Sequence, residues 1–271
     1  MTSVGIVTGA GSGIGAACAE ALAGTVDVLV LSDMNEAAVG EQAAKIGRAC
    51  EAVVGDLTDP AYVGELITSA SVRGTLRSVA HVAGISPTMS DWRRVLEVDL
   101  VATARLIDGL RALATRDTAV VCFASMAAYL NAQANPAADA AVDAPLADDF
   151  FDAYAAALGA QAHDPGVAYS WAKRGVQRLV QREAAAFGAQ GARICSVSPG
   201  MIDTPMGRQE YEQQPMMKVL EEMTPLQRIG RAEELAAVVQ FLCSDAASFI
   251  TGTDLLVDGG AVAAVAAMMG T

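Results

Sequence analysis

Short apolar segments alternate with longer segments of helical periodicity along this chain. Runs rich in Val, Leu, Ile and Ala predict seven strands, at Val4–Thr8, Val26–Ser32, Ala49–Val54, Ser78–Val82, Ala119–Ala124, Arg193–Val197 and Asp254–Val257. The stretches between them predict helices of three or more turns, at Ile14–Ala23, Glu36–Ile46, Pro60–Ala70, Asp91–Leu113, Tyr169–Phe187 and Glu233–Leu242. Parallel strands need crossover connections, which are usually helices. The pattern therefore predicts a doubly wound α/β fold, a parallel sheet with helices on both faces, in one domain over residues 1–271.

Composition limits the kinds of partner that this chain can have. With 53% apolar and 5% aromatic residues, its 271 residues predict a folded protein with a large core. The net charge of −13 repels phosphate backbones and anionic lipid, so we expect neither nucleic acid nor membrane as a partner. No basic region opens the chain and no apolar stretch approaches the ~20 residues of a membrane span, which predicts a soluble cytoplasmic protein.

The cysteines show no spacing typical of a metal site. They are five in number and far apart: Cys18, Cys50, Cys122, Cys195 and Cys243. We expect reduced core residues and no bound metal.

The first predicted strand leads directly into a glycine-rich turn and then a helix. The turn reads Thr8-Gly9-Ala10-Gly11-Ser12-Gly13-Ile14-Gly15. Glycine permits positive φ and a close approach of backbone N–H groups to a pyrophosphate, and the helix N-terminus adds a favourable dipole. With an acidic residue, Asp33, at the end of the second strand, this arrangement predicts a dinucleotide site in a Rossmann-type fold.

The acidic residue also selects the cofactor. The Asp33 carboxylate can accept hydrogen bonds from the adenosine ribose hydroxyls and would repel the 2′-phosphate of NADP. Neither the glycine turn nor the residues just after Asp33 contain Lys or Arg, so the sequence favours NAD. At the end of the third strand we expect Asp56 to meet the adenine edge and Asp59 to cap the following helix, although either could serve as the cap.

A tyrosine and a lysine have the spacing that carbonyl reduction and alcohol oxidation require. The reaction needs an acid or base at the substrate oxygen, and a free tyrosine, with a pKa near 10, is too weak a base at neutral pH. A lysine four residues away lies on the same helix face and can stabilise the phenolate. Only Tyr169 among the five tyrosines has a lysine at that spacing, Lys173. Ser125 follows the fifth strand at the carboxyl end of the sheet, where it can orient the substrate oxygen.

Taken together, these motifs resemble the single-domain branch of the short-chain dehydrogenase/reductase family over nearly the whole chain. The matching segments are Thr8–Gly15, Ala83-Gly84, Ser125, Tyr169-x-x-x-Lys173 and Pro199-Gly200. The resemblance implies a Ser–Tyr–Lys catalytic group, with Lys173 also holding the nicotinamide ribose and with Ile202 and Thr204 at the carboxamide. It also implies a homo-oligomer, a tetramer or a dimer.

Two residues depart from the family pattern. Asp99 stands where the family usually has an Asn that holds a water in the proton relay, and an ionised Asp can accept but not donate. We expect Asp99 to keep a diminished relay role and to alter the pH at which Tyr169 works. His81 stands where an Asn is common, and its position favours a satisfied sheet residue over a catalyst.

The predicted site contains a catalytic group and a larger set of cofactor-binding residues. The catalytic group is Ser125, Tyr169, Lys173 and Asp99. The cofactor-binding set is Gly9, Ser12, Gly13, Ile14, Gly15, Asp33, Met34, Asp56, Leu57, Ala83, Gly84, Tyr169, Lys173, Pro199, Gly200, Ile202 and Thr204.

Two segments interrupt the strand–helix alternation. In an insertion at 126–168, apolar residues recur every four positions, at Leu146, Phe150, Tyr154 and Leu158. With Pro145 at the first position and Gly159 at the end, this spacing predicts a helix packed at the active-site or subunit surface, with a loop as the alternative. The second segment, at 205–231, is rich in Met and Pro and predicts a mobile lid.

The insertion also bears on the substrate. It is similar, as is the Gly259-Gly260 region, to some bacterial hydroxysteroid dehydrogenase/carbonyl reductases, which implies a bulky apolar alcohol or ketone such as a steroid or terpenoid. Two alternatives stay open. A β-ketoacyl reductase would usually use NADP and a basic docking patch, against which Asp33 and the net charge speak. A non-catalytic NAD-binding protein would be expected to have lost part of the catalytic group.

Overall fold

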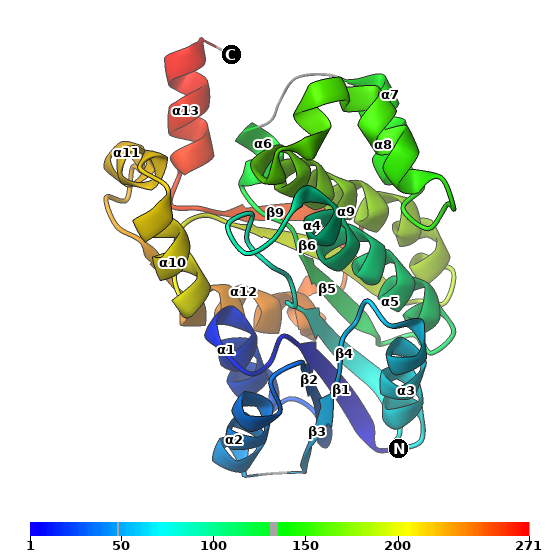
Figure 1. Ribbon diagram of the computed structural model, residues 1–271. Coiled ribbons are helices and arrows are strands. Elements are labelled where there is room, and N and C mark those ends of the chain that lie inside the picture. The colour runs from blue at the N-terminus through cyan, green and yellow to red at the C-terminus, as the bar shows by residue number, and fades with distance from the viewer. Residues whose placement is uncertain (48, 131–134, 271) are drawn as a thin grey trace.

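Seven parallel strands form one sheet in the computed structural model, which describes residues 1–47, 49–130 and 135–270 (Figure 1). The neighbours follow the order β3-β2-β1-β4-β5-β6-β9. Their bounds are β1 Ser3–Thr8, β2 Val28–Asp33, β3 Cys50–Val54, β4 Thr75–His81, β5 Ala119–Phe123, β6 Arg193–Pro199 and β9 Asp254–Val257. A separate short pair joins β7 Ile202–Asp203 to β8 Gly230–Arg231. The predicted α/β fold with a seven-stranded parallel sheet is confirmed, with strand bounds that shift by a few residues.

Helices cover both faces of the sheet. One face packs against α1 Gly13–Leu22, α2 Glu36–Ile46 and α12 Ala232–Cys243, and the other against α3 Pro60–Ser71, α5 Ala102–Arg111 and α9 Pro165–Gly188. In β1, Ile6 belongs to one of these two cores and the next residue, Val7, to the other. Because both faces are buried, the strands are continuous apolar runs rather than alternating ones.

The helix predicted at 91–113 is interrupted. It consists of α4 Trp92–Leu96, a π-helical turn at Glu97–Val101 and α5, with Asp99 inside the π turn. A π turn places one extra residue in the helix, and such turns are frequent at functional sites. Nothing in the apolar spacing indicates an extra residue, so the sequence predicted one continuous helix.

The helix that carries Tyr169 starts earlier than predicted. It begins at Pro165 because the Asp164 side chain accepts a hydrogen bond from the backbone of Val167 at 2.9 Å and Pro165 occupies the first helical position. Tyr169 therefore lies one turn inside α9, where the helix backbone already holds it, rather than at a fraying end.

The insertion at 126–168 is helical over much of its length. It contains α6 Ala127–Leu130, α7 Pro136–Asp143, α8 Phe150–Leu158 and a 3₁₀ turn at Gly159–His163, while 131–134 lie outside the described residues. The helix expected from Pro145 begins at Phe150 instead, and Leu146 is exposed. The residues between α7 and α8 form two turns instead. The Ala147 amide donates to the Ala144 carbonyl oxygen, and the Phe150 amide donates to the Ala147 carbonyl oxygen. The predicted end at Gly159, with φ of 58°, is confirmed.

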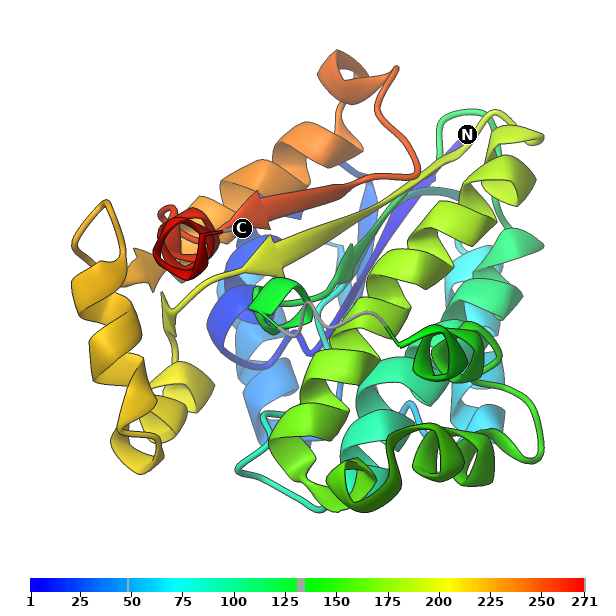
Figure 2. The same cartoon turned by 90° about the horizontal axis from the view of Figure 1, so that it is seen from above.

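The insertion packs on α9 through ion pairs and on α4 through aromatic rings. Asp139 of α7 accepts two hydrogen bonds from Arg174 of α9, at 2.6 and 2.9 Å. Tyr154 of α8 is fully buried and stacks on Trp92, with ring centroids 5.9 Å apart. These contacts place the insertion against the outer side of the Tyr169 helix (Figure 2).

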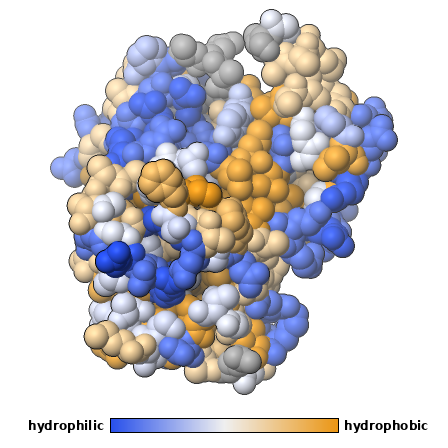
Figure 3. Space-filling view, turned by 180° about the vertical axis from the view of Figure 1, so that it is seen from behind, coloured by the Kyte–Doolittle hydropathy of each residue, from blue (hydrophilic) through white to orange (hydrophobic). Residues whose placement is uncertain are grey.

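The segment predicted as a lid forms two helices, α10 Pro205–Gln213 and α11 Met216–Met223. Seen from above, they lie on one side of the carboxyl ends of the strands, and α7 and α8 lie on the other (Figure 2). The last helix, α13 Ala261–Met269, projects upward, and Figure 3 shows apolar surface running down the face beside it. Its Met268 and Met269 are exposed. Among the described helices, none combines the length and apolarity needed to cross a membrane.

Candidate active site

The glycine turn has the geometry that a phosphate site requires. Gly9 and Gly13 have φ of 66° and 53°, a region that residues with side chains rarely adopt. At Gly15 an added Cβ would lie 1.9 Å from the Gly9 carbonyl oxygen, so only glycine allows this packing. The N-terminus of α1 has no side-chain cap from Ser12 and no acidic residue in its first turn, whereas Asn35, Asp59 and Asp164 cap α2, α3 and α9. The free N–H groups and the dipole of α1 fit a dinucleotide pyrophosphate.

Asp33 lies beside this turn at the end of β2. Its Oδ2 accepts a hydrogen bond from the Gly11 amide at 2.9 Å, and its Oδ1 accepts one from the Asn35 amide at 2.9 Å. Each carboxylate oxygen keeps a further lone pair for ribose hydroxyls. Met34, next in the chain, is 64% exposed.

The two aspartates after β3 have different partners. Asp59 caps α3 as predicted, since its side chain accepts from the Ala61 amide at 2.9 Å. Asp56 accepts from the Thr58 amide at 2.9 Å and from Arg94 Nη2 at 2.7 Å. Burial opposes ionisation of Asp56, but these hydrogen bonds keep its pKa below the ordinary value. Leu57 between them is buried.

A cavity of about 410 Å³ opens at the carboxyl ends of the strands. The predicted residues that line it are Ile14, Gly84, Ser125, Tyr169, Lys173, Pro199, Gly200, Ile202 and Thr204. Ser125 follows β5, and Tyr169 and Lys173 come from α9, so residues far apart in sequence meet at one point. The structure therefore brings the predicted Ser, Tyr and Lys together.

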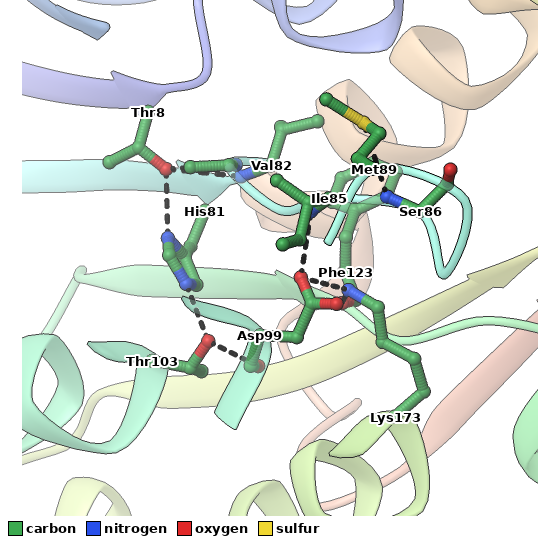
Figure 4. A network of polar contacts seen from close by, with 11 residues as sticks. Thr8, His81, Val82, Ile85, Ser86, Met89, Asp99, Thr103, Phe123 and Lys173 are labelled. Atoms are coloured by element: carbon green, nitrogen blue, oxygen red, sulfur yellow. Dashed lines mark hydrogen bonds and ion pairs between the residues drawn. The ribbon is translucent and has the colours of Figure 1, made fainter. Parts of the chain in front are cut away.

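Lys173 contacts the buried carboxylate of Asp99. Its Nζ donates to the Phe123 carbonyl oxygen at 3.2 Å and lies 3.4 Å from Asp99 Oδ1, which also accepts from the Ile85 amide at 3.0 Å (Figure 4). Asp99 Oδ2 is buried and has no hydrogen-bond partner within the part of the chain that the structure describes. Burial raises the pKa of Asp99, and the Lys173 charge opposes that shift.

Burial and nearby polar groups act on the pKa of Tyr169. Burial raises the pKa of its phenol above the ordinary value, and the Asp99 carboxylate raises it further, while the neighbouring Ser125 hydroxyl lowers it. Lys173 Nζ lies 5.5 Å from the centre of the Tyr169 ring. In this arrangement burial and the Asp99 carboxylate raise the pKa of Tyr169, and the lowering of that pKa by Lys173 stays a prediction.

His81 is a satisfied core residue, as predicted. Its Nδ1 and Nε2 each lie 2.8 Å from a hydroxyl, those of Thr8 and Thr103 (Figure 4). The Thr103 hydroxyl donates to the Asp99 carbonyl oxygen at 2.9 Å, so it can only accept from Nε2–H, and Thr8 must then donate to Nδ1. Burial lowers the pKa of His81 to about 3, which keeps the ring neutral.

The turn after β6 forms the opposite wall of the cavity. An added Cβ at Gly200 would lie 2.6 Å from Asp258 Cα, so the turn needs glycine there. Thr204 is buried and caps α10, because its Oγ1 accepts from the Gly207 amide at 3.0 Å. At Gly84, across the cavity, an added Cβ would meet Asp99 Oδ1 at 2.5 Å, while Gly9 packs against the backbone of Ala83.

Comparison with known proteins decides the family. A family model described as enoyl-(acyl carrier protein) reductase matches residues 9–144 and 152–262, which is most of the chain. This chain belongs to the short-chain dehydrogenase/reductase family.

Named relatives in this family are alcohol dehydrogenases. The chain is 32% identical to cis-4-hydroxycyclohexanecarboxylate dehydrogenase of Sinomonas cyclohexanicum, over 95% of both chains. It is 32% identical to cyclohexanol dehydrogenase of Acinetobacter sp. (strain SE19), over 94% of this chain and 93% of the relative. A solved short-chain dehydrogenase/reductase of the glucose/ribitol dehydrogenase type from Brucella melitensis superposes with a TM-score of 0.76, at 27% identity and 96% coverage of both chains.

Membership in the family settles the general chemistry. The protein is an oxidoreductase that acts on CH–OH groups of small-molecule alcohols and uses a nicotinamide cofactor.

Sequence reasoning missed residues that the lid brings to the cavity. Glu210 and Tyr211 of α10 and Met217 of α11 line it, opposite Ser125 and Tyr169. Thr204-Pro205, a cap followed by proline, was a usable signal for the start of α10. No local signal indicates which face of α10 meets the cavity, because that depends on the path of the chain after β7.

Proposed function

We propose that this enzyme interconverts a secondary alcohol and a ketone with NAD(H). The observation that carries the proposal is the convergence of Ser125, Tyr169 and Lys173 on one cavity whose walls continue to the glycine turn through Ile14 and Gly84. Cofactor and substrate would therefore occupy adjoining space, as hydride transfer requires.

Each side chain has a separate task in this proposal. The Ser125 hydroxyl orients the substrate oxygen, and the Tyr169 phenolate removes the hydroxyl proton during oxidation or returns it during reduction. Lys173 binds the nicotinamide ribose, and the Asp99 carboxylate positions Lys173 by contact with its Nζ. A nicotinamide cofactor bound by these residues would supply the hydride acceptor for oxidation and the hydride donor for reduction. The glycine turn with Gly13, Ser12 and Ile14 binds the pyrophosphate, and Ile202 and Thr204 meet the carboxamide.

The proposed cofactor is NAD rather than NADP. Asp33 keeps acceptor capacity for ribose hydroxyls while its charge opposes a 2′-phosphate. Asp56 and Leu57 lie at the next strand end and would border the adenine; Asp56 is held in place by Arg94.

The proposed substrate is largely hydrocarbon. The cavity walls are mainly apolar, with Leu130, Met206, Met217 and Leu220 among them. Methionines adapt to varied shapes, which suits a bulky ring system such as a steroid or terpenoid.

A panel of alcohols tests the proposal. The purified enzyme should oxidise at least one member of a set of steroid, terpenoid and aliphatic secondary alcohols in the presence of NAD. The formation of NADH is measured by its absorbance. Tyr169→Phe should lower kcat by at least ~100-fold, since general acid–base groups contribute about 10²–10⁴-fold, and should still bind NAD. Tight NAD binding by the wild-type enzyme without turnover of any alcohol would instead support a non-catalytic binding protein.

We also propose a homo-oligomer. The support is the exposed apolar surface of the C-terminal segment, where Leu255, Met268 and Met269 face solvent in the single chain. Light scattering coupled to size exclusion would measure the mass in solution, and a monomer at micromolar concentration would contradict the proposal.

A further inference from the structure

Among the described residues, the carboxylates of Asp203, Glu210 and Glu212 line the cavity together with mainly apolar side chains. Glu210 of α10 lines the cavity together with Met206, Met217 and Leu220, and its side chain is partly buried. It comes from α10, in the segment between the short strands β7 and β8.

Glu210 has no cationic partner among the residues that the structure describes. Its Oε1 accepts one hydrogen bond, from Gln214 Nε2 at 3.2 Å. Other acidic residues of the same segment are engaged: Asp203 pairs with Arg208 at 2.5 Å, and Glu221 accepts from the Tyr211 hydroxyl at 2.6 Å.

Among the described residues, two basic side chains line the cavity, and each already has an acidic partner. Lys173 contacts Asp99, and Arg208 contacts Asp203. Glu212, next along α10, also lines the rim but is exposed to solvent. The lid side of the cavity is therefore negative, with Glu210 its more enclosed charge.

Glu210 and Tyr169 line the same cavity. Its carboxylate contributes to the raised pKa of the Tyr169 phenol, after burial and Asp99. Burial in turn raises the pKa of Glu210 itself, because its environment already lacks part of the water that would solvate the charge.

A substrate that fills the cavity removes the remaining water from Glu210. A carboxylate that loses water without gaining a hydrogen bond costs free energy, whereas a donor on the substrate offsets that cost. A purely hydrocarbon substrate would leave the charge unsatisfied, and an anionic one would add repulsion.

We propose that Glu210 is a specificity-determining residue that accepts a hydrogen bond from a second hydroxyl of the substrate, away from the carbon that is oxidised. The substrate class is thus a mainly apolar, ring-sized or larger diol, and alcohols with a remote carboxylate are disfavoured. This inference rests on the proposed function and specifies the substrate for the same site.

Four ring alcohols that differ in one group test the inference. Cyclohexanol, 1,4-cyclohexanediol, 4-aminocyclohexanol and 4-hydroxycyclohexanecarboxylate place hydrogen, hydroxyl, ammonium or carboxylate opposite the reacting carbon. The measured quantity is kcat/KM with NAD, expressed relative to cyclohexanol for each enzyme variant. The ratio cancels any change in the Tyr169 pKa, because all four alcohols share the same base.

The wild-type enzyme should prefer the diol to cyclohexanol by on the order of tenfold, the worth of a hydrogen bond to a charged group. It should use the carboxylate least. Glu210→Leu removes the acceptor and should bring the diol ratio to about one. Glu210→Gln keeps an acceptor but no charge, so it should retain part of the diol preference and lose the discrimination against the carboxylate. Glu222→Gln, an exposed residue of α11 that does not line the cavity, removes the same charge and should leave all ratios unchanged.

The outcomes separate the two proposals. Turnover with unchanged ratios in Glu210→Leu overturns the role of Glu210 and leaves the dehydrogenase function intact. A wild-type preference for the ammonium over the diol that Glu210→Gln abolishes overturns the diol assignment in favour of an amino alcohol. Absence of turnover with these alcohols and with the wider panel overturns the proposed function, and the inference with it.

Discussion

Asp99 is buried beside Lys173, in the π-helical turn between α4 and α5. Its carboxylate contacts Lys173 and the Ile85 amide, and its second oxygen is buried without a partner among the described residues. A charge in that position acts on Tyr169 through Lys173 as well as directly. We therefore propose that Asp99 is a positioning residue that influences the pH at which Tyr169 works.

Replacing Asp99 by Asn should move the pH–rate profile of alcohol oxidation to lower pH. Oxidation needs the Tyr169 phenolate, and the Asp99 charge raises the pKa of that phenol, so removing the charge lowers the pKa. Asn still accepts from the Ile85 amide, which preserves the local fold. The measurement is kcat/KM against pH, with Glu65→Gln, an exposed carboxylate of α3, as the control. A profile that coincides with the wild type would exclude Asp99 from the mechanism.

Asp33 should decide between the two nicotinamide cofactors. Asp33→Asn keeps an acceptor oxygen for one of the Gly11 and Asn35 amides and removes the charge that repels a 2′-phosphate. We expect the NAD/NADP ratio of kcat/KM to fall by on the order of tenfold or more, since hydrogen bonds to a charged group contribute ~1.5–3 kcal/mol. Asp59→Asn, at a helix cap, should leave the ratio unaltered. Wild-type enzyme that uses both cofactors equally would contradict the assignment of NAD.

The sequence identified residues whose role depends on a short local pattern. The glycine turn, Asp33 and the Tyr169–Lys173 spacing each lie within one strand–turn–helix unit or one helix face, so local spacing determines their geometry. Ser125 follows a strand at the edge of the sheet where strand ends meet, but the family resemblance was needed to single it out. Glu210 was missed because its position depends on how α10 packs beside the cavity. That packing is set by contacts between residues far apart in sequence.

At the scale of elements, the long apolar runs were the most predictable and the alanine-rich insertion the least. A strand buried on both faces is apolar at nearly every position. In α7 the residues are mostly small, so its buried and exposed positions differ little in hydrophobicity. The Asn135-Pro136 pair, a cap and a first-turn proline, marks the start of α7 better than its hydrophobic spacing does.

The attachment of α7 to α9 should be measurable as stability. Asp139→Asn breaks the two-pronged contact with Arg174, whose side chains are partly shielded from water, and should lower the free energy of unfolding by about 1 kcal/mol. That corresponds to roughly 2–4 °C in Tm. Asp152→Asn is the control, because Asp152 is 88% exposed and lies 4.0 Å from Arg93.

The pH dependence gives this prediction a second test. The Arg174 guanidinium lowers the pKa of Asp139 in the folded state, so the contribution of the pair is present above the unfolded pKa and is lost as pH falls through the folded one. The difference in Tm between wild type and Asp139→Asn should therefore shrink at acidic pH. A difference that stays constant would mean that the pair does not stabilise the fold.

For the whole molecule, cofactor binding should stabilise the fold whether or not a substrate is known. At a concentration of 100 times Kd, a ligand adds about 2.7 kcal/mol, or roughly 5–10 °C in Tm. NAD should produce this shift in a thermal unfolding experiment, NADP a smaller one, and Asp33→Asn should reduce the difference. Equal shifts with both nucleotides would contradict the role of Asp33.

The strand order brings two parts of the chain together at the centre of the sheet. Strand β1 lies between β2, which follows it in sequence, and β4, which comes only after two further strand–helix units. The β1–β4 ladder thus divides the sheet into halves, with Asp33 on one and Lys173 beside the other. A dinucleotide that contacts both residues would link these halves, so amide hydrogen exchange in β2 and in β5 should slow together when NAD is added. Binding of the cofactor would then couple the local unfolding of the two halves of the sheet.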